Sequence, residues 1–416
     1  MLRIVPTLLP VATFVAVVAI GAIGATPRVA CADTIERRGL EPALRGKVEG
    51  VDEDGVRFRS DLGATQVIPW DRVRSVESGS FKTIVTSQMA VAEQLWRARS
   101  RVERGDTEQA EPLLERLFTT YRGRTSETAL VVAEGLLRCR LARADQALAV
   151  LPWLEVVRLR RAEIQTSSYA SLPPVIDRES GLAPLLPPVF VDDPASQRIR
   201  EELRRISTAP GTDDTVAQLA GLYALAMPLA AEGTLPESPT LPAMADPPPA
   251  AAGRSVDPAT ALVRLVLAAQ QIEPTTRDAA RRRIDELLAA ATPAAAASAG
   301  GGSDELLSPR IWSDAWLRFF GGCSRLREPD TALRRRGVVE LLHVPARDAR
   351  RLPFLSGAAL WLAAAAVGRD GDGQSSAVLR RELDLEFPAH PLRRSAPAGV
   401  EIAVERTPSP SSVRNP

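Results

Sequence analysis

Hydrophobic and polar positions follow two different periods along the chain. In Val56-Arg57-Phe58-Arg59, apolar and charged residues alternate, which places Val56 and Phe58 on one face of a strand and the arginines on the other. From Phe81 onward, apolar residues recur every three or four positions, which is the spacing of amphipathic helices. The sequence therefore predicts a mainly α-helical chain that begins with a small antiparallel β module over residues 33–79.

Short segments rich in Val, Ile and Phe form the predicted β module. Asp54-Gly55 and Asp61-Leu62-Gly63 provide turns between them. The pattern resembles the small barrels of the SH3-like and Sm-like families. A unit of this size buries little surface alone, so we expect it to dock on the following helices or to pair with another copy. The segments are residues 44–51, 56–60, 65–70 and 75–76.

An α-hairpin is predicted over residues 91–121. Asp106 and Gln109 have the spacing of a capping box, in which two side chains satisfy two free N–H groups at the start of a helix. Gly105-Asp106 is the predicted turn between this helix and the preceding one, residues 91–104. Each helix has an apolar stripe that needs a partner. In the second helix the stripe consists of Ala110, Leu113, Leu114, Leu117, Phe118 and Tyr121.

This hairpin pattern recurs along the chain. One set of positions, at Gly105-Asp106, Leu113, Leu117 and Tyr121, returns at a constant offset as Gly371-Asp372, Leu379, Leu383 and Phe387. A further turn is predicted at residues 142–147, with Ala147 at the position of Ala110.

The repeated hairpins resemble the tetratricopeptide-repeat (TPR) family, whose units of about 34 residues are helix–turn–helix with small residues where the helices touch. The resemblance covers Val91–Leu148 and Leu355–Pro391. It implies an irregular α–α hairpin (TPR-like) solenoid, and stacked hairpins of this kind present an extended curved surface to protein or peptide partners.

Helices interrupted by Pro-rich and Ala-rich stretches are predicted for the middle of the chain. Asp193-Pro194 and Asp257-Pro258 each place a capping acid before a proline at the first helical position. Helices are expected near residues 195–207, 213–232, 258–272, 275–291, 309–320 and 330–343. The predicted divisions after the β module are TPR-like hairpins (80–170), a Pro-rich extended strap lying against the helices (171–193), a helical segment (194–233), a Pro/Ala-rich linker (234–256), a helical hairpin (257–291), an Ala/Gly-rich linker (292–303), further TPR-like hairpins (304–392) and a disordered tail (393–416).

The first 32 residues have the three parts of a secretory signal peptide. Arg3 supplies a positive start, residues 11–23 are apolar, and Ala30-Cys31-Ala32 offers small residues for cleavage, with Ala30 and Ala32 as the recognition positions. We therefore expect an exported protein of the periplasm or cell envelope. Two alternatives remain open: an uncleaved membrane anchor over residues 4–27, and a lipid attached through Cys31.

Composition narrows the classes of partner. The chain carries 52 basic and 51 acidic residues, a formal charge of +1, and therefore lacks the surplus of positive charge that drives nucleic-acid binding. We expect no nucleic acid, and contact with a membrane only through an uncleaved N-terminal segment. After cleavage two cysteines remain, Cys139 and Cys323, which either pair or stay as buried thiols.

Candidate chemistry is sparse. The sequence contains no GxSxG, HExxH or GxxxxGK[ST] motif. Asp370-Gly371-Asp372-Gly373 has calcium-loop composition, but Gly368 and Leu379 occupy loop positions that need carboxylates, so an interhelical turn is favoured. A His343–Cys323 pair has no local activating group. The arginine runs 281–283 and 334–336 are interpreted as solvated faces, and the cluster Trp312, Trp316 and Phe319 as core.

We therefore predict no catalytic residue, no metal ligand and no cofactor. The leading hypothesis is an exported, non-enzymatic helical-repeat protein that binds or scaffolds other proteins in the cell envelope. Two alternatives are an α-helical, toroid-like hydrolase of envelope glycans or peptides, acting through scattered Asp and Glu, and a structural part of an envelope complex held by the β module.

Overall fold

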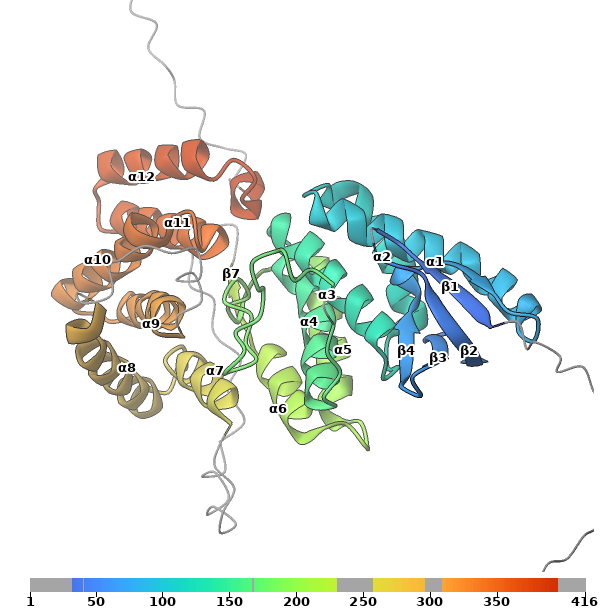
Figure 1. Ribbon diagram of the computed structural model, residues 1–416. Helices are drawn as coiled ribbons and strands as arrows, with labels where there is room; N and C mark the ends of the chain where they lie inside the picture. The colour runs from blue at the N-terminus through green and yellow to red at the C-terminus, as the bar shows by residue number, and fades with distance from the viewer. Residues whose placement is uncertain (1–31, 40, 167, 230–256, 296–308, 396–416) are drawn as a thin grey trace, which may run out of the picture.

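The computed structural model describes residues 32–39, 41–166, 168–229, 257–295 and 309–395. Within these ranges the protein is mainly helical, with twelve α-helices, one five-stranded antiparallel sheet and one parallel pair of short strands (Figure 1). The predicted class, mainly α with a small antiparallel β module, is confirmed at this level. Ala32 is exposed and lies directly before the first strand, whereas Ala30 and the rest of the predicted signal peptide lie outside the described residues.

The β module is a sheet with strand order β4-β3-β2-β1-β5. Its inward face follows from the alternation in the sequence, because Val56 and Phe58 are both fully buried. Strand β1 was not predicted from the sequence, since Ile35 is its one large apolar residue. The elements are β1 (Asp33–Arg37), β2 (Leu44–Val51), β3 (Gly55–Ser60), β4 (Thr65–Pro69), the 3-10 turn η1 (Trp70–Arg72) and β5 (Val73–Glu77).

The sheet docks on the helices that follow it. The Tyr121 hydroxyl donates to the carbonyl of Glu53 at 2.8 Å, and Arg99 pairs with the fully buried carboxylate of Asp71 at 2.6 Å. Two turns of the β module are therefore joined to the first hairpin. That hairpin and the next consist of α1 (Lys82–Glu103), α2 (Thr107–Tyr121), α3 (Glu127–Ala142) and α4 (Gln146–Arg161).

The middle of the chain differs from the prediction at one element. The expected helix 213–232 ends at Tyr223, and residues 227–229 instead form a strand parallel to residues 189–191. Pro228 lacks an N–H group and its ring would clash with the preceding helical turn, so the helix cannot continue through it. The elements here are β6 (Val189–Val191), α5 (Pro194–Thr208), α6 (Asp214–Tyr223) and β7 (Met227–Leu229).

The C-terminal half contains the remaining helices. Helix α8 runs to Ala295, so residues 292–295 are not linker; the alanine-rich run 289–295 favours the helix even though it contains Pro293, which lacks an N–H group. Residues 393–395, predicted as the start of a disordered tail, belong to a 3-10 turn instead, and Arg393 pairs with Asp384 at 2.7 Å. The elements are α7 (Pro258–Ala268), α8 (Pro274–Ala295), α9 (Pro309–Arg325), α10 (Thr331–Asp348), α11 (Pro353–Arg369), α12 (Gly373–Glu386) and η3 (Pro391–Ser395).

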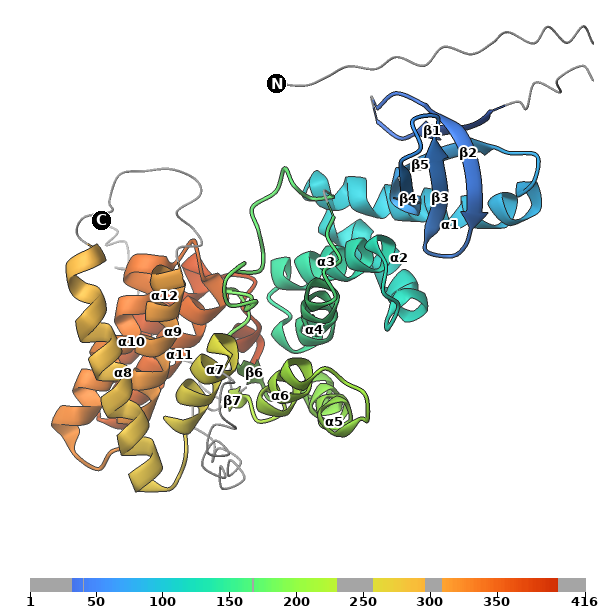
Figure 2. The same ribbon diagram turned by 60° about the horizontal axis from the view of Figure 1, so that its bottom comes forward.

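Helices pack in chain order. Each helix from α1 to α11 packs against the next, and α1 with α3, α7 with α9 and α9 with α11 also touch. Figure 2 shows the result as two bodies, the β module with α1–α4 and the group α7–α12, with α6 and residues 168–188 between them and α5 packed on the far side of α6. We call residues 33–161 the N-terminal half and residues 258–395 the C-terminal half.

One interhelical turn occurs three times. A residue with positive φ donates its N–H to the carbonyl three residues back, and the following Asp donates its N–H to the carbonyl five residues back. The φ angles are 79° at Gly105, 58° at Ala144 and 94° at Gly371. The first and last turns, which correspond in sequence, therefore also have the same backbone geometry. The third turn was aligned wrongly: Asp145 is equivalent to Asp106, so Ala149 and not Ala147 takes the place of Ala110.

The helix starts after these turns differ in their side-chain caps. The side chain of Asp145 accepts the N–H of Leu148, whereas the side chain of Asp106 accepts no such bond, so the predicted capping box with Gln109 does not form. The carbonyl of Gln109 instead accepts a hydrogen bond from Arg101 at 3.0 Å.

Candidate functional site

The tetrapeptide with calcium-loop composition is the turn between α11 and α12. Asp372 accepts the N–H of Ser375 at 2.9 Å, and Asp370 accepts from Arg334 at 3.0 Å. Both carboxylates are therefore used in holding the turn. Among the described residues, no group of three or more His, Cys, Asp and Glu side chains has a metal-binding arrangement.

The two cysteines of the described chain are buried free thiols and do not pair with each other. Desolvation raises the pKa of Cys139 to about 12 and raises the pKa of Cys323 well above its usual range. A thiol held in its neutral form is a poor nucleophile. His343 is exposed and faces Arg318 and Arg347, so the structure supplies no activated His343–Cys323 pair.

Both arginine runs contain a residue that pairs with an acid, which is Glu328 of the α9–α10 connection for Arg281 and Glu340 of the same helix for Arg336. Arg281 contacts Glu328 at 2.6 Å, and Arg336 contacts Glu340 at 3.3 Å. Arg282, Arg283, Arg335 and Arg336 are exposed, which agrees with the interpretation of solvated faces, whereas Arg281 and Arg334 are half-buried. The aromatic cluster is core, as interpreted: Trp312, Trp316 and Phe319 are at most 3% exposed.

The segment 162–188 is held by three buried aromatic side chains from three different helices. Trp153 of α4 donates to the carbonyl of Gly181 at 3.0 Å, and Trp316 of α9 donates to Pro184 at 3.0 Å. The Tyr223 hydroxyl of α6 donates to Leu186 at 2.7 Å. We call residues 172–188 the strap. It is hydrogen-bonded to both halves, through Trp153 and Trp316.

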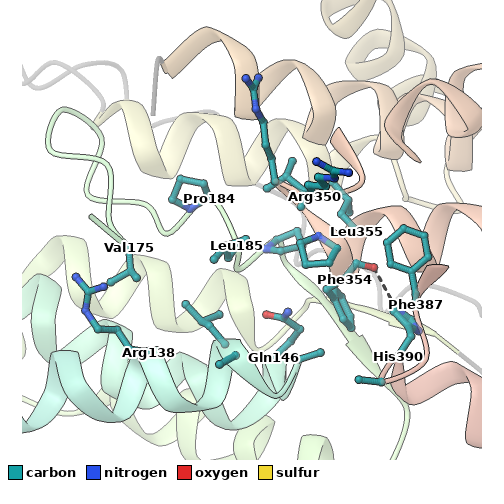
Figure 3. Close-up of a pocket in the computed structure, with 18 of the residues that line it drawn as sticks. Arg138, Gln146, Val175, Pro184, Leu185, Arg350, Phe354, Leu355, Phe387 and His390 are labelled. Carbon is teal, nitrogen blue, oxygen red and sulfur yellow. Dashed lines mark hydrogen bonds between the residues drawn. The ribbon is translucent and has the colours of Figure 1, made fainter. Parts of the chain in front are cut away.

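A groove lies between the halves beside the strap (Figure 3). It has two adjoining lobes with volumes of ≈ 510 and ≈ 300 Å³, which share the strap residues Val175, Pro184 and Leu185 and the α10–α11 turn at residues 350–352. The larger lobe is closed on one side by the turns that begin α2 and α4, and on the other by residues 386–390. We call this feature the inter-half groove.

The walls of the groove are mainly apolar, but two buried polar groups in them lack partners. Gln146, the first residue of α4, is 4% exposed, and its Oε1 atom has no hydrogen-bond partner among the described residues. Figure 3 shows its amide directed from α4 toward the cavity. In the smaller lobe, Trp312 is 3% exposed, and its Nε1 atom likewise has no partner in the described part of the chain. Buried polar groups are normally satisfied, so both are informative.

Arginines mark the mouth of the groove. Arg138 is neutralised by Glu134 at 2.7 Å and also donates to the carbonyl of Pro173 at 2.9 Å. Arg350 and Arg351 are exposed. Arg351 donates its backbone N–H to the carbonyl of Asp348 at 3.0 Å and interacts electrostatically with the Asp348 carboxylate, and no salt bridge within 4 Å joins either guanidinium group to a carboxylate of the described residues. The mouth therefore offers two guanidinium groups to an anionic group.

The C-terminal lip of the groove is built on His390. Its Nδ1 accepts the N–H of Leu392 at 3.2 Å, so the ring proton is on Nε2, which donates to the carbonyl of Phe354 at 3.0 Å. The ring stacks on Phe354 with centroids 5.2 Å apart and lies against Gly357, where a Cβ atom would approach it to 2.4 Å. Burial lowers the pKa of His390 to about 4.

Comparisons with family models, with curated proteins and with solved structures found no match to this chain. The TPR-like and SH3/Sm-like resemblances therefore remain predictions. In the described ranges, no helix combines the length and the apolar character needed to cross a membrane.

The sequence did not predict the groove. Its lining comes from residues 102–390, so no local pattern contains it. The one local signal is Gln146, a polar residue in the first turn of a helix that is otherwise buried on most sides.

Proposed function

We propose that the chain is an exported, non-enzymatic helical-repeat protein whose inter-half groove binds an extended peptide segment of a partner protein in the cell envelope. Export is supported by the N-terminal sequence pattern. A TPR-like solenoid is supported by the packing of each helix on its neighbours in chain order and by the turn that recurs at Gly105, Ala144 and Gly371.

The observation that carries the proposal is the unpartnered Oε1 atom of Gln146 beside an apolar cavity of ≈ 510 Å³. Ligand sites typically combine apolar walls with a few polar groups that fix orientation. Gln146 offers an acceptor and two donors, and rotation of its last side-chain bond turns either end toward the groove. A peptide backbone supplies both N–H and C=O groups, whereas an acyl chain supplies no donor.

The elongated form of the groove also favours a peptide. Its two lobes adjoin along the strap, and the second lobe presents the unpartnered donor of Trp312. The acidic residues that line the lobes are Glu386 in the larger and Asp348 in the smaller, and neither lobe presents a carboxylate pair. No observation therefore favours the hydrolase alternative, which remains a prediction.

Selection from a random peptide library tests this proposal. Purified protein is panned against displayed 12-residue peptides, and fluorescence anisotropy then measures the binding of selected peptides. We expect binding that is lost in Leu185→Glu, which places a charge in both lobes, and kept in Val339→Glu, a matched change on the exposed face of α10. Failure to enrich any peptide, or equal binding to both variants, would contradict a peptide-binding groove.

A further inference from the structure

The lip of the inter-half groove, residues 386–390, lies directly before the last described element of the chain. Residues 386–390 line the larger lobe, and η3 follows them and ends at Ser395. The chain continues from this point as residues 396–416. Residues 396–416 therefore follow an element that comes directly after the groove lining in the sequence.

That segment has a sequence that complements the groove. Residues 400–405 read Val-Glu-Ile-Ala-Val-Glu. In an extended backbone, alternate side chains point to opposite sides, so Val400, Ile402 and Val404 share one side while Glu401 and Glu405 share the other. The apolar side matches the walls of the groove, and the acidic side matches the exposed guanidinium groups at residues 350–351.

The attachment makes the contact easy to form. The five residues from Ser395 to Val400 reach at most about 17 Å when fully extended. A segment tethered this closely has an effective concentration in the millimolar range, so a weak contact is enough to populate the bound state. The backbone of the segment also supplies the N–H and C=O groups that Gln146 and Trp312 lack.

We infer that the inter-half groove binds the chain's own segment Val400–Glu405 as an extended apolar–acidic peptide. This inference rests on the proposed function, because it names the class of peptide that the same groove accepts. A partner peptide then has to displace the segment, and the affinity of the protein for its partner is set by that competition.

Competition for a labelled peptide tests the inference on the full chain. The probe is a fluorescein-labelled synthetic peptide of residues 398–407, and its binding is measured by fluorescence anisotropy. The test variant carries aspartate at three apolar positions of the segment, Val400→Asp, Ile402→Asp and Val404→Asp. A matched control carries the same three added charges further along, as Thr407→Asp, Ser409→Asp and Ser411→Asp.

We expect the test variant to bind the probe at least about tenfold more tightly than the wild-type and control chains, because their own segment competes. Adding Leu185→Glu to the test variant should abolish that binding. Equal affinity of all three chains, or no binding by the test variant, would overturn the inference. A gain that occurs only where light scattering shows the wild-type chain to be a dimer would also overturn it, because the occupant would belong to a second copy. The proposed function is judged separately, since library selection does not depend on the tail.

Discussion

Lowering the pH should weaken the lip of the groove through His390. The folded protein holds this ring neutral, with Nδ1 accepting the N–H of Leu392, and burial lowers its pKa from 6.5 to about 4. The unfolded chain binds the proton near pH 6.5, whereas the folded chain binds it near pH 4. The stabilisation from the neutral ring is therefore complete above pH 6.5 and is lost as the pH falls through 4.

The size of the effect follows from the two pKa values. One unit of pKa difference corresponds to about 1.4 kcal/mol, so His390 contributes about 3 kcal/mol in total, of which about 2 kcal/mol is lost by pH 5. Protonation of Nδ1 would also point an N–H group at the N–H of Leu392, so the 3-10 turn η3 should open first.

Urea unfolding between pH 7.5 and pH 4.5 measures this contribution. His390→Gln keeps a donor for the carbonyl of Phe354 but does not titrate. Between pH 7.5 and pH 5, the unfolding free energy of this variant should therefore decrease by about 2 kcal/mol less than that of the wild-type chain. The other histidine, His343, is exposed, and His343→Gln is the matched control. Parallel pH profiles for wild type and His390→Gln would refute the account of His390.

Further predictions concern packing and turn geometry, and all are measured by urea unfolding at pH 7.5. Ala144→Gly should stabilise the protein by about 0.5–1 kcal/mol, because Ala144 has a φ of 58°. Gly105→Ala at the equivalent turn should destabilise the protein by about 1 kcal/mol. Destabilisation by the first substitution together with stabilisation by the second would contradict the shared turn geometry. Trp316→Phe removes the hydrogen bond to Pro184 and should cost about 1–2 kcal/mol, and an unchanged stability would show that the strap is held without it. Arg325→Met removes the guanidinium group that pairs with the buried Glu340 at 2.6 Å and with Asp285 at 2.6 Å, and it leaves Arg336 as the remaining partner of Glu340, so it should cost about 3 kcal/mol. Arg325→Met with Glu340→Met should recover part of that loss, and no recovery would argue against a charge effect.

Local patterns in the sequence were enough to predict whether most segments form helices or strands. The alternation at Val56 and Phe58 identifies a strand because one face of the sheet is buried, and both side chains are fully buried. Strand β1 was not predicted because its sequence, Asp-Thr-Ile-Glu-Arg, contains a single large apolar residue. The position of this strand is set by its pairing with β2 and β5. The end of α6 was predicted wrongly because the apolar run from Leu222 to Met227 fits a helix and a buried strand equally well.

The groove depends on contacts that no local pattern contains. Val102, Leu185 and His390 are far apart in the sequence and line one groove because the strap lies between the two halves and is hydrogen-bonded to both. The Pro-rich composition of the strap predicted an extended segment, but not the tryptophan donors from α4 and α9 that fix it. Gln146 resembles any polar residue in the first turn of a helix until its burial is known.

Hydrogen–deuterium exchange tests the peptide-binding groove most directly. The amides of the strap (172–188) and of the lip (386–390) should exchange more slowly when the protein is saturated with a library-selected peptide, because the peptide covers both and restrains the segments that line the groove. Helix α5, which does not line the groove, should show no change. Protection confined to α5 or to the β module, or no protection at the strap and lip, would contradict the claim that the groove between the halves is the binding site.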